Sequence, residues 1–142
     1  MSEKISNKSK QSKKSGADWA RQQEELIKKG VKYCFASYVD AHGIPKGKTV
    51  PVHHFERMMR GSELFTGAAL DGLGQGPNDD ELAIHPDASA VTQLPWRPEI
   101  AWCPGNLKYH DDPWHMCSRT LLSQQVERAA KMGYGLNLGI EC

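Results

Sequence analysis

A glycine-rich stretch in the middle of the chain sets the strongest limit on how it can fold. Four glycines stand within ten residues: Gly67, Gly72, Gly74 and Gly76. Glycine enters backbone conformations that are closed to other residues, and it weakens the interiors of helices and strands. Together with the acidic turn at 78–81, this stretch predicts a long loop that a ligand or another chain can approach closely. Phe65, Leu70 and Leu73 supply apolar anchors, which favour an ordered loop over a disordered one.

The composition is typical of a globular domain of ordinary size. Of the 142 residues, 39% are hydrophobic and 25% are charged, and the formal net charge is +1. Such a balance gives no electrostatic basis for binding nucleic acid or an anionic membrane, and no apolar run is long enough to span a bilayer. The four cysteines have no C-x-x-C spacing, so we expect reduced thiols in the cytoplasm rather than disulfides or a zinc site.

Two segments of different composition precede the first expected strand. Residues 1–16 are rich in lysine and serine, and nothing in them offsets the entropy of ordering, so they are predicted to form a disordered basic tail. Trp19, Leu26 and Ile27 share one side of a helical period, and two lysines and a glycine follow them. This pattern predicts a helix over 17–30.

Alternation and turn residues predict two strands and a short helix in the next part of the chain. Apolar and polar residues alternate through 31–40, which indicates a strand with one buried face. A turn leads into a second strand that ends at Val50. Pro51 is suited to the first position of a helix and Gly61 to its end.

A hairpin-like unit is predicted after the glycine-rich stretch. Residues 90–94 and 99–103 have the composition of strands, and the proline-bracketed turn 95–98 joins them. Pro104 and Gly105 are expected to close this unit. No further strand is predicted between the glycine-rich stretch and the unit.

The carboxyl-terminal part is predicted to hold a helix and a strand. Asp112 followed by Pro113 has the pattern of a helix start, with an acidic N-cap and a proline in the first turn, and a helical period continues to Met132. Residues 134–141 then alternate like a strand. Because this strand is still under way at Cys142, we expect a truncated reading frame or a fragment of a longer protein.

The order of these elements indicates a small mixed α+β domain followed by the start of another unit. Several motifs occur along it in a fixed order: F-T-G, the glycine-rich loop, an acid pair, P-D-A-S and L-P-W-R-P-E. This order resembles the amino-terminal domain of glutamine synthetases, most closely the type III-like branch that includes γ-glutamylmethylamide synthetases. The likeness covers roughly 31–141. It implies a β-grasp domain over 31–111 and the beginning of a catalytic domain, cut short, over 112–142.

The resemblance implies an ATP-dependent ligase that forms a γ-glutamyl amide from glutamate and ammonia or methylamine through γ-glutamyl phosphate. ATP and Mg²⁺ or Mn²⁺ are the implied cofactors, because hard cations bind oxygen ligands and neutralise the charge on a transferring phosphoryl group. A homo-oligomer with active sites between subunits is also implied. For this chain alone we expect no bound cofactor, no catalytic residue and no activity.

Candidate site residues come from the resemblance in two places. Glu141, in the sequence G-I-E, matches the first ligand position of the family's metal-binding pattern G-x-E-x-E. Thr66 stands where the family has an aspartate that reaches a neighbouring subunit's active site and binds ammonium, and Gly67, Asp71 and Asp80 follow in the same loop. A hydroxyl has neither the charge to attract a cation nor the basicity to deprotonate it. Thr66 therefore favours an amine such as methylamine over ammonium, with Asp71 or Asp80 supplying charge from nearby.

A second interpretation belongs to another class of protein. A stand-alone β-grasp module would bind the sheet edge of a full-length synthetase and regulate its assembly, because open sheet edges are templates for pairing. Coding sequence that continues in frame past Cys142 would favour the ligase fragment over this module. A basic-tailed RNA-binding domain is disfavoured, because no basic face lies outside the tail.

Two other patterns do not predict a phosphate-binding site or a metal site. The segment G-L-G-Q-G resembles a phosphate cradle but lacks the Lys-Ser/Thr pair of a P-loop. The six histidines show no metal-ligand spacing, so we interpret them as structural or solvated.

Overall fold

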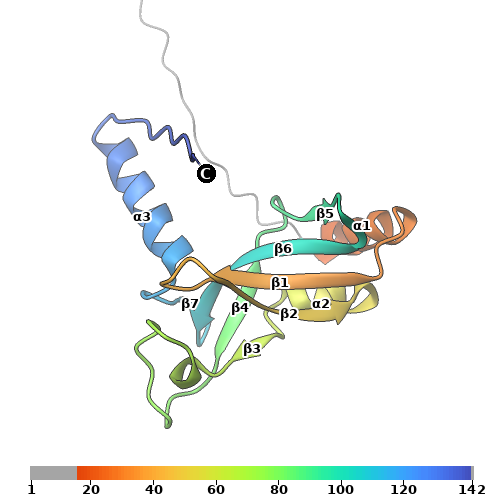
Figure 1. Cartoon of the computed structure of the whole chain (residues 1–142), viewed down its shortest axis with the longest axis horizontal. Coiled ribbons are helices and arrows are strands. Elements are labelled where there is room, and N and C mark those ends of the chain that lie inside the picture. Colours follow the sequence, from red (N-terminus) through yellow and green to blue (C-terminus); the bar gives the residue numbers. More distant parts are fainter. Residues whose placement is uncertain (1–15, 142) are drawn as a thin grey trace, which may run out of the picture.

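One long strand organises the sheet of this protein. The computed structural model describes residues 16–141, and Figure 1 shows its strands in a curled sheet with helices beside it. In chain order the elements are α1 Gly16–Lys28, β1 Tyr33–Val39, β2 Pro45–Pro51, a 3₁₀ turn Val52–His54, α2 Phe55–Met59, β3 Leu64–Phe65, a 3₁₀ turn Gly67–Ala69, β4 Leu82–Pro86, β5 Thr92–Leu94, β6 Arg97–Tyr109, β7 Asp112–Pro113 and α3 Ser118–Lys131. The strand order is β2-β1-β6-β4-β3, and β5 and β7 also pair with β6.

The 13 residues of β6 reach across both halves of the sheet. Its first half pairs in parallel with β1, and its second half pairs antiparallel with β4, where Gly105 lies opposite Pro86. The expectation that Pro104 and Gly105 close a hairpin-like unit is therefore wrong. A Cβ atom at Gly105 would lie 2.7 Å from the carbonyl oxygen of His85, so glycine is what lets β4 approach β6 this closely.

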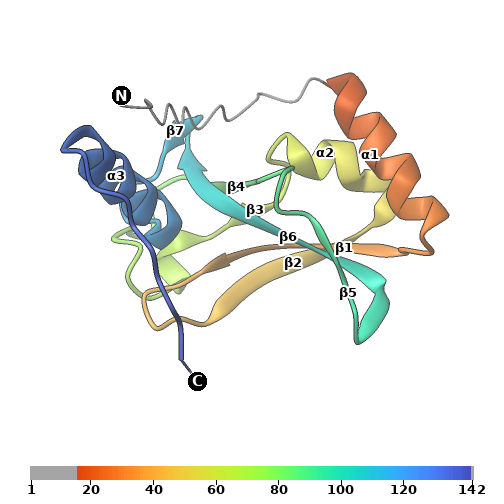
Figure 2. The same cartoon turned by 90° about the horizontal axis from the view of Figure 1, so that it is seen from above.

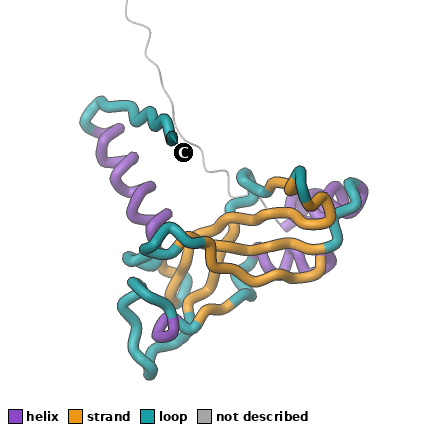
Figure 3. The backbone as a smooth tube through the Cα atoms, in the orientation of Figure 1, coloured by secondary structure: helices purple, strands orange, loops and turns teal. Residues whose placement is uncertain are grey.

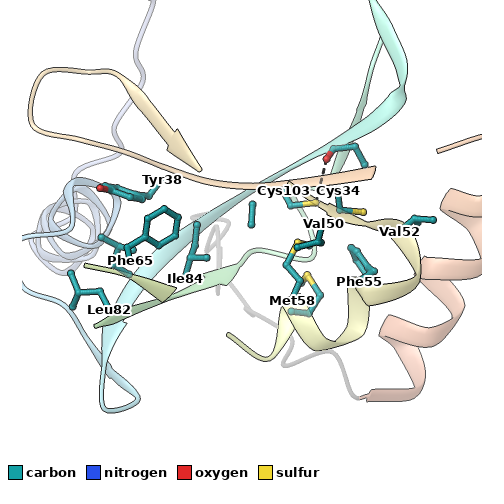
Figure 4. Close-up of a cluster of buried hydrophobic side chains, with 14 of the residues drawn as sticks. Cys34, Tyr38, Val50, Val52, Phe55, Met58, Phe65, Leu82, Ile84 and Cys103 are labelled. Carbon is teal, nitrogen blue, oxygen red and sulfur yellow. Dashed lines mark hydrogen bonds between the residues drawn. The ribbon is translucent and has the colours of Figure 1, made fainter. Parts of the chain in front are cut away.

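The core lies against the face of the sheet that α1 and α2 cover (Figure 2). Cys34 of β1, Leu107 of β6 and Phe55 of α2 are fully buried; Figure 4 shows the neighbourhood of Cys34 and Phe55. The ring of Tyr38 in β1 meets the ring of Phe65 in β3 edge-on, with centroids 5.3 Å apart. Because two strands separate β1 from β3 in the sheet order, this contact requires the sheet to curl around its core.

The mixed α+β fold class predicted from the sequence is confirmed. The predicted helix at 17–30 corresponds to α1, the two strands before Val50 correspond to β1 and β2, and the predicted hairpin corresponds to β5 and the first part of β6. The short helix is α2, and Gly61 follows it with a φ of 89°. Pro51, however, is the last residue of β2 rather than the first of the helix.

The stretch between the glycine-rich loop and β5 holds a strand that the sequence did not predict. This strand, β4, lies between β6 and β3 in the sheet, and its Leu82 and Ile84 are fully buried. It is five residues long and includes His85 and Pro86. Proline is depleted in strands, so the local signal is weak, and pairing on both sides makes the segment a strand.

Asp112 and Pro113 do not begin a helix, contrary to the prediction. They form β7, which pairs with the end of β6 after a tight turn in which His110 and Asp111 have φ values of 47° and 69°. Left-handed conformations at both central residues suit a two-residue turn between antiparallel strands. This pairing outweighs the local helix-start pattern, and α3 begins only at Ser118.

The strand predicted over 134–141 is also not formed. The segment pairs with no strand in the described part of the chain, and Figure 3 draws it as loop beyond α3. Its apolar side chains are exposed, Ile140 by 86%. A strand needs a partner for its backbone N–H and C=O groups, and this segment has none among residues 16–141.

Several expectations concern the chain ends, the cysteines and membranes. The tail predicted at 1–16 lies outside the described residues except for Gly16, which begins α1. Cys34, Cys103 and Cys117 are free and buried, and Cys142 lies outside the described residues. Among residues 16–141, no helix has the length and apolar character needed to cross a membrane. The boundaries 31–111 and 112–142 stay predictions.

Candidate functional site

The glycine-rich loop, residues 66–81, connects β3 to β4 and is closed at its base by a pair of side chains. β3 and β4 are antiparallel with Phe65 opposite Leu82, so the next step of the register places Thr66 opposite Glu81. The Thr66 hydroxyl donates a hydrogen bond of 2.9 Å to Oε1 of Glu81. Both side chains are exposed, whereas Leu82 beside them is fully buried. The pair therefore stands at a defined place at the end of two packed strands.

Several side-chain contacts are made within the loop and between the loop and Trp114. The side chain of Gln75 lies against Gly67, where any Cβ atom would overlap it. Nε2 of Gln75 donates a hydrogen bond of 2.9 Å to the carbonyl oxygen of Asp80. Leu73 is buried, and its carbonyl oxygen accepts a hydrogen bond of 3.0 Å from the indole N–H of Trp114. A residue larger than glycine at position 67 would therefore require the side chain of Gln75 to move.

Two carboxylates of the loop lie beside histidines from other turns of the sheet. Asp71 lies 3.7 Å from Nε2 of His42 in the β1–β2 turn. Asp80 lies 3.2 Å from Nε2 of His110 in the β6–β7 turn. Each pair joins opposite charges only when its histidine is protonated, and all four side chains are largely exposed. These pairs place the outer part of the loop beside the β1–β2 and β6–β7 turns.

The structure places four of the predicted site residues on this loop and the fifth far from it. Thr66 is exposed at the base, Gly67 is buried, and Asp71 and Asp80 are exposed on the outer part. Glu141 is exposed in the segment after α3, which Figure 1 shows above the sheet while the loop lies below it. Within residues 16–141, no three His, Cys, Asp or Glu side chains gather in a group that could hold a metal ion.

Sequence reasoning missed Glu81 and Gln75 as members of this site. The sequence showed Glu81 only as part of the acidic turn 78–81. Recognition of β4 would have located it, because the register of the β3–β4 pair then sets Glu81 opposite Thr66. Gln75 has no comparable signal, since its contact with Gly67 depends on how the loop closes.

Curated proteins and solved structures similar to this chain agree on its family. The chain matches no protein-family model. It is 36% identical over 113 residues to the glutamine synthetase of Rhizobium meliloti (strain 1021), which covers 80% of this chain and 26% of that protein. It is 32% identical over 120 residues to the glutamate–methylamine ligase of Methyloversatilis universalis, which covers 84% of this chain and 27% of that protein. A solved structure of a GmaS/ADP complex matches with a TM-score of 0.73 and 26% identity, covering 78% of this chain and 25% of that one.

Over about four fifths of its length, the chain is similar in sequence and fold to members of the glutamine synthetase family. The resemblance drawn from its motifs is thereby confirmed. Its curated relatives are ligases, and the chain spans about a quarter of their length. A GmaS structure without ligand gives a similar match, with a TM-score of 0.72.

The P-D-A-S motif of the chain, residues 86–89, links the β4–β5 turn to α3. Oδ1 of Asp87 accepts hydrogen bonds of 2.9 and 2.6 Å from the backbone N–H and the hydroxyl of Ser89. Oδ2 of Asp87 accepts one of 2.8 Å from Arg119 in α3. Partial burial opposes ionisation of Asp87, but the bonds from Ser89 and the charge of Arg119 outweigh it and lower the pKa of this carboxyl. The motif therefore holds the first turn of α3 against the sheet.

The L-P-W-R-P-E motif forms the turn between β5 and β6. Next to it, Nε2 of Gln93 donates hydrogen bonds of 2.7 Å to the carbonyl oxygen of Pro98 and 3.0 Å to that of Lys29, which follows α1. Trp96 at the tip is 75% exposed. Gln93 therefore connects the motif and the end of α1, and the motif contributes no titratable group to the glycine-rich loop.

A surface groove of about 280 Å³ lies where α3 meets β1 and β6. Val39, Trp102 and Leu122 are among the apolar side chains that line it. Its one charged lining residue, Arg119, is paired with Asp87. Its lining has no carboxylate, histidine or cysteine, and Tyr38 is its one ionisable side chain besides Arg119. The glycine-rich loop is therefore the better candidate site.

Proposed function

We propose that this chain is part of an ATP-dependent ligase that joins glutamate to ammonia or a small amine through γ-glutamyl phosphate. The observation that carries the proposal is its similarity, at 36% and 32% identity, to a glutamine synthetase and a glutamate–methylamine ligase. The match to a GmaS/ADP complex supports a nucleotide substrate. The complete ligase would use ATP with Mg²⁺ or Mn²⁺, work in the cytoplasm and form a homo-oligomer with active sites between subunits.

In the complete ligase, residues 31–111 would form the β-grasp domain and 112–142 would begin the catalytic domain. Glu141 would then be one of several carboxylates around a divalent cation, a type of ligand that hard cations prefer. The described residues do not fit such a cation by themselves, because 16–141 contain no group of three side chains that could hold it. We therefore expect neither ATP hydrolysis nor amide formation from the 142-residue chain alone.

The amine would be received by the glycine-rich loop, with Thr66 facing it from a neighbouring subunit. Thr66 is exposed at the end of β3, where another subunit has access to it. A threonine side chain carries both a hydroxyl and a methyl group, so it accommodates the methyl group of methylammonium. This favours methylamine over ammonia as the substrate.

An assay of γ-glutamyl amide formation tests the proposal. The complete protein that contains this chain should form γ-glutamylmethylamide and phosphate from glutamate, methylamine and ATP, with a higher kcat/KM for methylamine than for ammonia. The isolated chain serves as the control and should form neither amide under the same conditions. A complete protein that forms no amide with either amine would overturn the ligase function, and an active isolated chain would overturn the fragment interpretation.

The alternative, a stand-alone module that pairs with a sheet edge, has little support in this fold. β2 forms one edge of the sheet, but Pro45 and Pro51 stand at its two ends and Lys46 and Lys48 lie between them. β3 forms the other edge and is two residues long. Lysines, prolines and very short strands are features that protect sheet edges from strand addition. We therefore favour the ligase.

A further inference from the structure

An exposed tryptophan marks one end of the molecule. Trp96 is 75% exposed, although tryptophan is on average one of the more buried residue types. Leu94 of β5 pairs with Arg97 of β6, so Pro95 and Trp96 form a two-residue turn between them. Pro95 fixes its own φ angle, and the hydrogen bonds from Gln93 connect β5 with β6 and with the residue after α1. The indole is therefore presented on a short, restrained turn and loses little freedom when it binds.

The groove where α3 meets β1 and β6 lies at another part of the surface and is open to solvent. Its volume is about 280 Å³, below the range of about 300–1,000 Å³ that is typical of sites for drug-sized ligands. Val39, Trp102 and Leu122 in its walls are 39%, 37% and 53% exposed. The groove therefore has uncovered apolar walls on a scale that suits one large side chain.

The groove matches an indole in chemistry as well as in size. The ring of Trp102 in its wall offers an aromatic surface for stacked or edge-on contact. Ser118 also lines the groove, and its hydroxyl donates a hydrogen bond of 2.7 Å to the carbonyl oxygen of Val39. The hydroxyl oxygen keeps lone pairs that can accept a hydrogen bond from an indole N–H. An inserted tryptophan thus meets both an apolar wall and a polar partner.

Neither the turn nor the groove brings an unpaired arginine into such a contact. Nη2 of Arg119, which lines the groove, lies 2.8 Å from Oδ2 of Asp87. Nε of Arg97, next to Trp96 in the chain, lies 3.3 Å from Oε1 of Glu99. Because both guanidinium groups already have carboxylate partners, insertion of the indole does not bury either charge without a partner.

A single molecule cannot place Trp96 in its own groove. Six positions along the chain, about 20 Å of strand, separate Trp96 from Trp102 in the groove wall. Over this length β6 is paired with β1 and β5, so it cannot fold back. Figures 1 and 2 show the β5–β6 turn and α3 at opposite ends of the molecule. The tryptophan of one molecule therefore reaches only the groove of another.

We propose that Trp96 of one copy of this chain inserts into the groove between α3 and the sheet of a second copy. A second copy is the partner because the chain itself carries both complementary surfaces. The contact is heterologous: each copy offers a turn on one side and a groove on the other, so association continues head to tail unless a ring closes. This interface goes beyond the proposed ligase function, and its groove shares no residue with the glycine-rich loop.

The contact is small, so we expect it to be weak. A tryptophan side chain buries about 150–250 Å², and a groove that encloses it buries a similar area, which together make about 300–500 Å². Stable interfaces bury about 1,200 Å² or more. The Kd should accordingly be on the order of 0.1–1 mM, so that the copies associate only in concentrated solution.

Sedimentation equilibrium of the 142-residue chain at concentrations up to about 1 mM tests the inference. The average mass of the wild type should rise above that of one chain as the concentration increases. Trp96→Ala removes the indole and Leu122→Trp fills the groove, so each should weaken association at least about tenfold. Tyr134→Ala is the matched control, because it removes an aromatic ring that is 66% exposed and belongs to neither surface. It should leave the Kd within about twofold.

A mixture of the two weakened variants gives the sharpest test. Trp96→Ala keeps an intact groove, and Leu122→Trp keeps an intact turn. Neither variant should associate alone, whereas an equimolar mixture should form a 1:1 dimer with a Kd within about twofold of the wild-type contact. The dimer should not grow, because its remaining turn lacks the indole and its remaining groove is filled. Leu122→Glu, which places a charge in the groove, replaces Leu122→Trp in the mixture if the larger side chain lowers the melting temperature.

The outcomes decide the inference without any ligase assay. A wild-type chain that stays monomeric up to about 1 mM overturns it, and so does association that Trp96→Ala leaves unchanged. Association that Trp96→Ala abolishes but that the mixture does not restore also overturns it, because the tryptophan would then bind elsewhere than in the groove. None of these results bears on amide formation by the complete protein, so the ligase function stands or falls separately.

Discussion

The sheet core and the carboxyl-terminal arm of this protein both have regularly spaced apolar residues in their sequences, but the environments of these residues are opposite. The arm comprises α3 from Leu121 onward and residues 134–141. In the core, Leu107 of β6 is fully buried, whereas Leu122 and Leu138 in the arm are 53% and 69% exposed. Every core strand has a partner in the sheet, while the arm projects from it (Figure 1).

This contrast shows that an apolar pattern becomes buried structure only where another element covers it. The alternation in β1 buries Cys34, Ala36 and Tyr38, and the similar alternation over 134–141 buries nothing. A lone strand leaves its backbone groups unpaired, and an isolated helix of 14 residues such as α3 is marginal in water. The arm therefore depends on its attachment at the first turn of α3.

Amide hydrogen exchange should give the largest difference between the two regions. Amides of β6 from Ala101 to Leu107 should open only with global unfolding, at about 5 kcal/mol or more. Amides of α3 from Leu122 to Lys131 should open by local fraying, so their exchange should be roughly a thousandfold faster. Exchange measured by NMR on the 142-residue chain would show this gap. Equal protection in both segments would break the comparison and show that the arm is packed in solution.

Truncation of one core side chain should have the next largest effect. Phe55 of α2 is fully buried, so Phe55→Ala should lower the free energy of unfolding by about 3–5 kcal/mol, through lost burial and the cavity left behind. Leu138→Ala in the arm is the control and should change it by less than about 0.5 kcal/mol. Urea denaturation of the three proteins measures both effects. Similar losses in the two variants would contradict the division into core and arm.

Loss of the bond that attaches the arm should have the smallest effect on the free energy of unfolding, and this effect should depend on pH. Asp87 accepts a hydrogen bond from Arg119, and its pKa is lowered in the folded state. A lowered folded pKa stabilises the protein above the ordinary aspartate pKa, about 4, and this contribution is lost as the pH falls through the lowered value. Asp87→Asn should therefore cost about 0.5–1 kcal/mol near pH 7, a value limited by solvent screening, and almost nothing in acid.

Urea denaturation at pH 7 and at an acid pH checks the sign of this dependence. Glu127→Gln, at an exposed position of α3, is the control. At each of the two pH values its free energy of unfolding should equal that of the wild type. A destabilisation by Asp87→Asn that grows in acid would contradict the assignment of the lowered pKa to Asp87. Loss of amide protection in α3 of the Asp87→Asn variant, with β6 unchanged, would sharpen the comparison further.

Much of the fold follows from patterns that are local in the chain. The helical period of Trp19, Leu26 and Ile27 and the alternation through 31–40 predicted α1 and β1, because each depends on neighbouring residues. The glycines between Gly67 and Gly76 predicted the long loop for the same reason. The motif order was enough to reveal the resemblance to glutamine synthetases, which the similar curated proteins confirm.

The predictions failed where partners distant in the sequence decide the outcome. Asp112 and Pro113 have the local pattern of a helix start, but the pairing of β7 with β6 makes them a strand. Residues 134–141 have the pattern of a strand, but they lack the second strand that would complete it. Local propensities amount to about 1 kcal/mol per residue or less, so ladder bonds and burial override them.

The candidate site was likewise predicted only in part from the sequence. Thr66, Gly67, Asp71 and Asp80 were predicted as site residues from the sequence, because a motif and several closely spaced glycines mark their loop. The pairing of Thr66 with Glu81 was decided only by the tertiary structure, since β4 has a weak local strand signal. Its register against β3 brings the hydroxyl within 2.9 Å of the carboxylate. A register is set by burial of Leu82 and Ile84 against strands far away in the chain, and a linear pattern does not contain that information.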